Sequence, residues 1–76
     1  MNNDRRDTLR QIDRLLSQAH ALLTEVRDDE ENALAAMPES FQFSMKGAKM
    51  ESAISDMDEA LMSLESAREY LEEAAA

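Results

Sequence analysis

Two runs of apolar residues with heptad spacing, separated by the only proline, constrain this chain more than any other feature. In the first run, steps of three and four alternate, with Glu30 as the polar exception, through Leu9, Ile12, Leu16, Ala19, Leu23, Val26, Ala33 and Met37. The second run has Arg68 as its exception and passes through Met50, Ile54, Met57, Leu61, Leu64, Leu71 and Ala75. Such spacing places the apolar residues on one face of an α-helix. Because proline disfavours the α conformation at the preceding residue, the first helix must end near Met37.

The pattern predicts one all-α domain over residues 1–76, with a helix at about 5–37, a loop at about 38–45 and a helix at about 46–75. Helices of nearly equal length joined by a short link favour an antiparallel, coiled-coil-like hairpin. We expect Asp4 or Asp7 to cap the first helix and Ser44 to cap the second. The expected seam packs one set of residues against another: Ile12, Leu16, Ala19, Leu23 and Val26 against Ile54, Met57, Leu61 and Leu64.

The small size of the chain favours self-association. A core built from 76 residues supplies only a few kcal/mol, and the chain has no cysteine for a disulfide. Leu15 and Leu22 form a second apolar column, which a single partner helix cannot cover together with the main seam. A further column contains only small residues, Ala53, Ala60, Ala67 and Ala74, and would let a neighbouring helix approach closely. The sequence therefore predicts a helical-bundle homo-oligomer.

Composition excludes several classes of protein. Without cysteine there is no disulfide scaffold and no thiolate metal site. One glycine, one valine and two isoleucines are too few for a small β-sandwich or barrel. No apolar run approaches the ~18 residues that a membrane span needs, so no membrane association is expected. The amino-terminal segment lacks the apolar stretch of a signal peptide, and we therefore expect a cytoplasmic protein.

The residue types that catalysis or metal binding requires do not occur in a usable arrangement. His20 is the only histidine, and no nucleophile and carboxylate accompany it as a catalytic set. Ser17 stands where the Glu-x-x-His signature of helical di-iron sites needs a glutamate. Asp56 and Asp58 resemble the start of a calcium loop but lie inside a periodic helix without the required glycine. The sequence predicts no enzyme, no metal site and no cofactor.

The charge pattern bears on nucleic-acid binding. Eight basic against seventeen acidic residues give a net charge of −9, which opposes direct DNA binding. The arginines at the start of the first helix lie, in a hairpin, beside the acidic end of the second helix, which matches most of their charge. The acidic run at residues 28–31 has two interpretations. It pairs with Lys46 and Lys49 across the hairpin, with local fraying, or it binds a divalent ion at an oligomer centre.

The loop carries the most unusual composition in the chain, with the only proline, the only glycine and both phenylalanines. One interpretation is structural: the aromatic rings close the end of the helix pair or pack on a neighbouring subunit. The other is a binding site, in which the helix start and two lysines hold an anion and a ring stacks on a base. The candidate ligand-binding residues are Phe41, Gln42, Phe43, Ser44, Lys46, Gly47 and Lys49.

The same segment, Met37-Pro38-Glu39-Ser40-Phe41-Gln42-Phe43-Ser44-Met45-Lys46-Gly47, carries a family resemblance. With the helix that follows, it resembles small acidic proteins encoded by bacteriophages, prophages and mobile elements of Gram-positive bacteria. Their loop runs apolar-Pro-Glu-x-apolar-Gln-x-Ser-x-basic-Gly between two acidic helices. Phe41 departs from the pattern, because that group usually has an aliphatic residue there. The resemblance implies a genomic setting, and a bacterial host cytoplasm, more than an activity.

Three functions are compatible with these observations. The favoured hypothesis is an anti-defence protein whose oligomer sequesters a small anionic nucleotide signal of the host. An alternative is an acidic protein-interaction module that blocks a host defence enzyme which binds nucleic acid. The third is a coiled-coil scaffold or assembly component. The expected partners are therefore a second copy of the chain and either a nucleotide ligand or a host defence protein.

Overall fold

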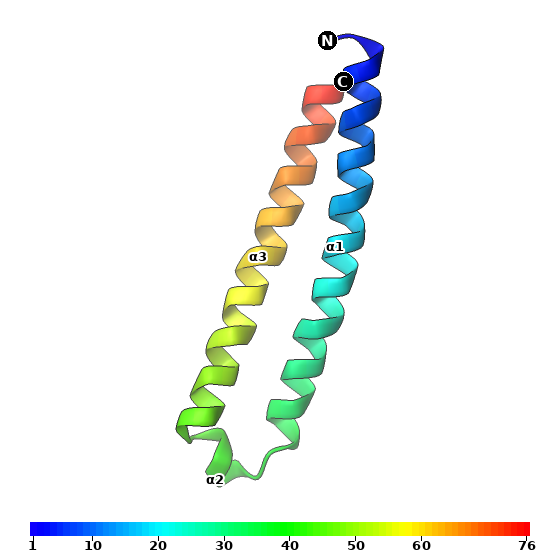
Figure 1. The fold of residues 1–76 in the computed structure, drawn as a ribbon. Helices are drawn as coiled ribbons and strands as arrows, with labels where there is room; N and C mark the ends of the chain where they lie inside the picture. Colours follow the sequence, from blue (N-terminus) through cyan, green and yellow to red (C-terminus); the bar gives the residue numbers. More distant parts are fainter.

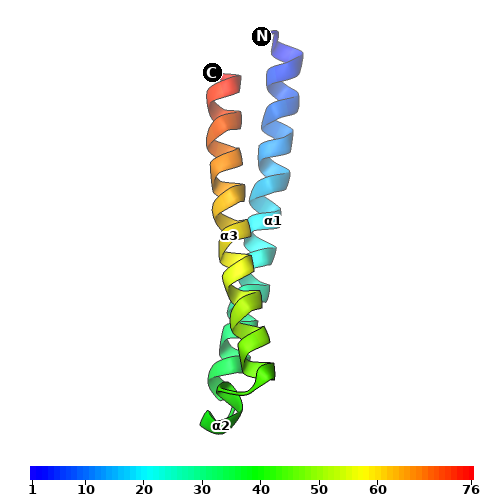
Figure 2. The ribbon, with the colours of Figure 1, turned by 90° about the vertical axis from the view of Figure 1, so that its left-hand side faces the viewer.

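A computed structural model describes residues 1–76 and contains three helices and no strands: α1 (Asn3–Ala36), α2 (Glu39–Gln42) and α3 (Met45–Ala75). The two long helices run antiparallel, with both chain termini at one end and α2 at the other (Figures 1 and 2). The molecule measures 58 × 14 × 12 Å. Its radius of gyration of 17.2 Å exceeds the ~11 Å of a compact domain of this length, so the hairpin is elongated.

The boundaries of α1 follow from its terminal residues. Asn2 has an extended backbone, and its side-chain oxygen accepts a hydrogen bond from the backbone N–H of Arg5 at 2.9 Å. The cap is therefore Asn2, and the prediction of Asp4 or Asp7 is wrong. Asp4 instead lies in the first turn, where a carboxylate favours the positive end of the helix dipole. At the other end, Met37 has ψ 146°, the extended conformation that Pro38 imposes on the residue before it.

The connection between the long helices contains the short helix α2, which the sequence analysis assigned to a loop. The predicted N-cap of α3 is confirmed, because the Ser44 hydroxyl accepts a hydrogen bond from the backbone N–H of Gly47. Gly47 is buried, and a Cβ atom placed on it would lie 2.1 Å from the carbonyl oxygen of Gln42. The backbone after α2 thus packs directly on the first turn of α3, and only glycine leaves room for it.

The seam of α3 is as predicted, and that of α1 is not. The least exposed residues of α3 include Met50, Ile54, Met57, Leu61, Leu64, Arg68, Leu71 and Ala75. On α1, Leu9, Leu16, Leu23, Glu30 and Met37 are half-buried as expected. The predicted positions between them, Ile12, Ala19 and Val26, are exposed, and the next residues along the chain, Asp13, His20 and Arg27, turn inward instead. This rotation brings polar residues of α1 within reach of charged residues on α3.

The resulting core is thin. Ile54, with 9% of its surface exposed, is the only buried apolar side chain. The remaining seam residues are half-buried, because two helices shield each other on one side only. None of the helices combines the length and the apolar character needed to cross a membrane.

Candidate functional site

One edge of the helix interface is held by hydrogen-bonded ion pairs. The Nε–H of Arg27 on α1 donates to Oδ1 of Asp58 on α3 at 2.8 Å. Toward the open end of the hairpin, the Nε–H of Arg68 on α3 donates to Oδ1 of Asp13 on α1 at 2.9 Å. Each pair joins residues far apart in the sequence, one on each long helix. These contacts fix the register of the two helices.

A third contact lies between the other two. The Nε2 atom of His20 is 3.0 Å from Oε1 of Glu65 on α3. Asp13, His20 and Arg27 are each seven residues apart, so the three contacts follow the same edge of α1. We call this edge, with Asp58, Glu65 and Arg68 of α3, the ionic edge. In the sequence, this edge corresponds to polar residues at heptad spacing, each directly after Ile12, Ala19 or Val26. The apolar heptad pattern alone does not identify them.

The hydrogen bonds of the two arginines stabilise the charged forms of Asp13, Arg27 and Arg68. Hydrogen bonding by Arg68 holds the pKa of Asp13 below its ordinary value, and the same contact raises the pKa of Arg68. The hydrogen bond with Asp58 raises the pKa of Arg27, with a further contribution from Asp28. These groups therefore remain charged at neutral pH.

The acidic run at residues 28–31 does not pair with the lysines of α3. Asp28 and Glu31 instead form ion pairs with Arg27, and Lys46 and Lys49 have no carboxylate within ion-pair distance. The expected pairing is wrong because the run flanks the ionic edge, whereas the two lysines lie on other columns of α3. No group of three or more histidine, aspartate or glutamate side chains is placed to hold a metal ion.

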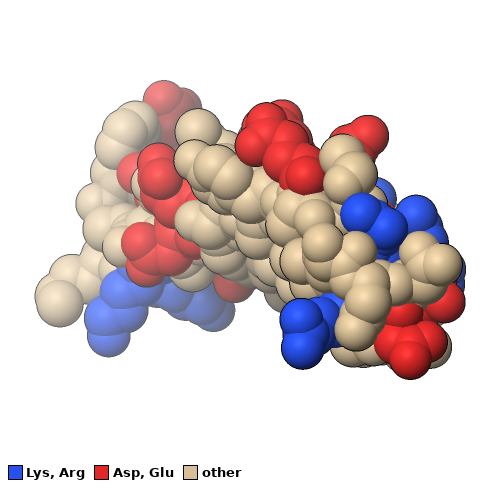
Figure 3. All heavy atoms as spheres, turned by 90° about the horizontal axis from the view of Figure 1, so that it is seen from above, with Lys and Arg blue, Asp and Glu red and all other residues tan.

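The edge opposite the ionic edge is apolar. Ile12, Leu15, Leu22 and Val26 of α1 are exposed there, Leu15 and Leu22 at 63% and 64%. Next to them on α3 runs the alanine column, of which Ala53 and Ala67 are half-buried against the seam. Figure 3, which looks onto the end of the hairpin that carries the termini, shows basic and acidic side chains in separate patches with other residues between them. We call these residues of α1 together with Ala53, Ala60, Ala67 and Ala74 the apolar edge.

The candidate site residues in the loop gather at the tip of the hairpin, and they divide into two groups. Some shape the tip: Gln42 donates a side-chain hydrogen bond to the carbonyl of Met37 at 2.9 Å, and Ser44 caps α3. Gly47 faces the backbone of its own chain and is closed to a ligand. The others are available on the surface, namely Phe41, Phe43, Lys46 and Lys49.

The exposed part of the tip is convex. Phe43 is 84% exposed, and Met45 beside it is 79% exposed, more than any other large apolar residue. Both cavities in the hairpin lie at the opposite end, so the tip encloses no volume of its own. The hydrogen bonds of Gln42 and Ser44 join the backbone segments from which these two side chains project.

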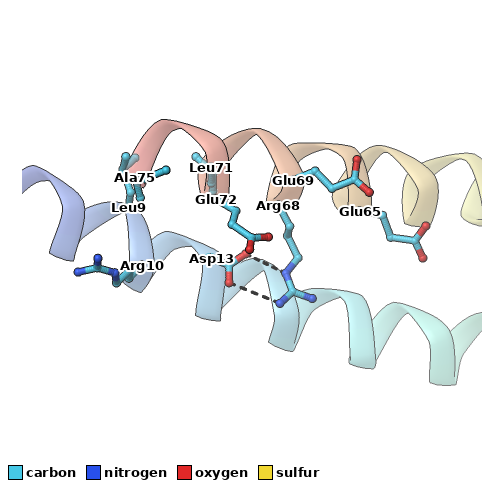
Figure 4. Close-up of a pocket in the computed structure, with 10 residues that line it drawn as sticks. Leu9, Arg10, Asp13, Glu65, Arg68, Glu69, Leu71, Glu72 and Ala75 are labelled. Atoms are coloured by element: carbon cyan, nitrogen blue, oxygen red, sulfur yellow. Dashed lines mark hydrogen bonds and ion pairs between the residues drawn. The ribbon is translucent and has the colours of Figure 1, made fainter. Parts of the chain in front are cut away.

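The larger cavity, which the sequence analysis did not predict, is an open groove of about 760 Å³ between the ends of α1 and α3. Leu9, Leu71 and Ala75 supply apolar surface, while Glu65, Glu69 and Glu72 project from α3 (Figure 4). Arg68 crosses the groove to Asp13 and divides it. The cation at the centre of the groove, Arg68, is already paired with Asp13, so we assign the groove a structural role.

Comparison with known proteins adds no assignment to this geometry. No protein-family model, no curated protein and no solved structure matches the chain. Three features of the hairpin bear on its function: the ionic edge, the apolar edge and the tip. The charged groups of the ionic edge are paired within one chain. The apolar edge and the tip expose apolar side chains that no part of the hairpin covers.

Proposed function

We propose that this chain is a non-enzymatic, self-associating binding protein that engages a partner protein through the tip of the hairpin. The observation that carries this proposal is the exposure of Phe43 and Met45 on a convex, hydrogen-bonded projection. Exposed aromatic residues are typical anchors of protein interfaces, because they bury much apolar area when a partner covers them. A convex anchor fits a concave pocket on a partner.

The two lysines indicate the charge of that partner's surface. Lys46 and Lys49 lie one turn apart on α3, on neighbouring columns of one face, and neither is paired within the chain. A pocket that accepts Phe43 with carboxylates at its rim would complement both features. In the phage or mobile-element setting that the loop resemblance implies, the partner is a host defence protein.

Nucleotide sequestration is the second candidate, and the unpaired lysines favour it. The backbone N–H groups in the first turn of α3 have no partner within the helix. The Ser44 side chain accepts a hydrogen bond from one of them, that of Gly47, and Phe41 lies nearby for stacking. Against this stands the shape of the tip, because nucleotide sites are concave and this surface is not. A nucleotide therefore fits this surface less well than a protein partner does.

Acidic mimicry of a nucleic acid is supported less than either. Such a surface needs a continuous ribbon of free carboxylates at roughly the spacing of the phosphates. Asp58 and Glu65, two acidic residues seven positions apart on α3, are instead paired with Arg27 and His20.

The test compares wild type and two variants in host lysate, with quantitative mass spectrometry of the captured proteins. Phe43→Ser removes the proposed anchor, and Tyr70→Ser, at an exposed aromatic residue on α3, is the matched control. We expect a host protein that wild type and Tyr70→Ser capture equally and that Phe43→Ser loses. A panel of cyclic di- and trinucleotides, titrated calorimetrically against wild type and a Lys46→Glu/Lys49→Glu variant, tests the second candidate. Nucleotide binding that the double variant loses, without a Phe43-dependent protein partner, would replace the proposal by nucleotide sequestration.

A further inference from the structure

We infer that the apolar edge is the interface with a second copy of this chain, packed antiparallel about a two-fold axis that passes Ala19. The inference rests on the proposed self-association and supplies its geometry. The product is a four-helix bundle in which α1 meets the second α1 and α3 meets the second α3. The ionic edges face solvent on both sides, and the two tips lie at opposite ends.

Apolar area requires such a partner. The hairpin buries one apolar side chain, Ile54, whereas a stable domain of this size needs a core worth several kcal/mol. The apolar edge runs for about 30 Å along α3, and a second copy packed on it would cover that length. Leu15 and Leu22 would then become core residues. The hydrophobic gain comes from burying area that the single chain exposes.

The spacing of the residues on α1 indicates a two-fold axis. Ile12 and Val26 each lie seven residues from Ala19, while Leu15 lies four before it and Leu22 three after it. In either direction along α1, the side chains of this column are therefore large, large, small, large and large. An interface between identical surfaces must be self-complementary, and an antiparallel pair centred on Ala19 places Ile12 of one chain opposite Val26 of the other.

The alanine column of α3 has the same centre. Its four residues are symmetric about the midpoint between Ala60 and Ala67, at Ser63 and Leu64. The 3.0 Å contact between His20 and Glu65 places that midpoint level with Ala19 to within about 2.5 residues, or ~4 Å. One axis therefore relates both columns of the edge to themselves. Alanine at each contact lets the two α3 helices approach closely.

Charged residues at the ends of the α1 column fit the same arrangement. Arg5 and Asp29 continue the column beyond Ile12 and Val26, and neither side chain has an ion-pair partner within the hairpin. Antiparallel pairing about Ala19 brings Asp29 of one chain within about one helical turn of Arg5 of the other. The long arginine side chain can span that distance. Both ends of the interface then carry an ion pair.

Cysteine substitution tests the geometry, since the protein contains no cysteine of its own. Ala19→Cys places two thiols next to the axis, and Ala21→Cys, also at an exposed alanine of α1 but on a different face, is the matched control. We expect mild oxidation to link Ala19→Cys into a covalent dimer and to leave Ala21→Cys unlinked. Mixing Ile12→Cys with Val26→Cys should give a linked heterodimer that neither variant forms alone.

Light scattering on the unmodified chain separates failure of this interface from failure of self-association. A dimeric mass with efficient linkage of Ala21→Cys instead of Ala19→Cys would overturn the interface and leave self-association intact. A monomeric mass at high micromolar concentration would overturn both. Leu22→Glu should shift the mass to that of one chain, while Lys46→Glu/Lys49→Glu should leave the dimer unchanged, because the lysines lie outside the symmetric part of the edge.

Discussion

Arg27 of α1 and Asp58 of α3, separated by 31 residues in the sequence, are joined by a 2.8 Å hydrogen bond from Nε to Oδ1. The same guanidinium also contacts Asp28 and Glu31 through its NH1 group. One guanidinium thus provides the counter-charge for three carboxylates. It turns toward α3 at a position that does not belong to the apolar heptad pattern. This arrangement explains why α1 presents a polar heptad to its partner helix.

Replacing Arg27 with Met should lower the urea midpoint of unfolding more than replacing Arg10 with Met. The first change retains the aliphatic surface but leaves Asp28, Glu31 and Asp58 facing each other without a counter-charge. The second removes an arginine whose single ion pair, with Asp7, is exposed and local. Circular dichroism during urea titration measures both midpoints. Equal midpoints for the two variants would show that the network around Arg27 adds nothing.

Stability should fall on acidification through protonation of Asp13. Its pKa is depressed in the folded chain, mainly by the hydrogen bond with Arg68, so the carboxylate stabilises the folded state above its unfolded pKa. That contribution is lost as the pH falls through the depressed value, below about 4. Asp13→Asn should be less stable than wild type at pH 7, and the difference should shrink toward pH 2. Thermal unfolding at a series of pH values measures this, and a constant difference would contradict it.

Leu61→Ala should cost about 2 kcal/mol, the lower end of the range for buried leucines, because Leu61 is half-buried in the seam. Met62→Ala, at the next residue and 59% exposed, should change stability by less than about 0.5 kcal/mol. Denaturant titration at one fixed protein concentration compares the two, since association would add to the stability. A cost under half a kcal/mol for Leu61→Ala would mean that the register of α3 is wrong.

Gly47→Ala should destabilise the protein, contrary to helix propensity. In an ordinary helix interior, alanine is more stable than glycine by about 0.5–1 kcal/mol. Here the new methyl group would lie 2.1 Å from the Gln42 carbonyl oxygen and 2.9 Å from that of Phe41, both part of the backbone. Relief requires the chain after α2 to move away from α3. A raised melting temperature for Gly47→Ala would show that this close packing is absent.

The sequence by itself determined the two long helices, the end of α1 before Pro38, the Ser44 cap and the seam of α3. Each of these depends on interactions within a few residues or on a regular period, and α3 has one apolar period with a single interruption. Its inward face is therefore unambiguous. The antiparallel direction follows from the short connection.

Only the tertiary structure decided the rotation of α1, the role of Gly47 and the position of the exposed surfaces. α1 carries apolar residues over more than one helix face. Its own sequence therefore does not decide whether Ile12 or Asp13 turns toward α3. The choice was made by Asp58, Glu65 and Arg68, which lie on the other helix and pair with Arg27, His20 and Asp13 only in one rotation. Those long-range pairs turn Leu15 and Leu22 outward, because one helix pair cannot bury two faces of α1 at once.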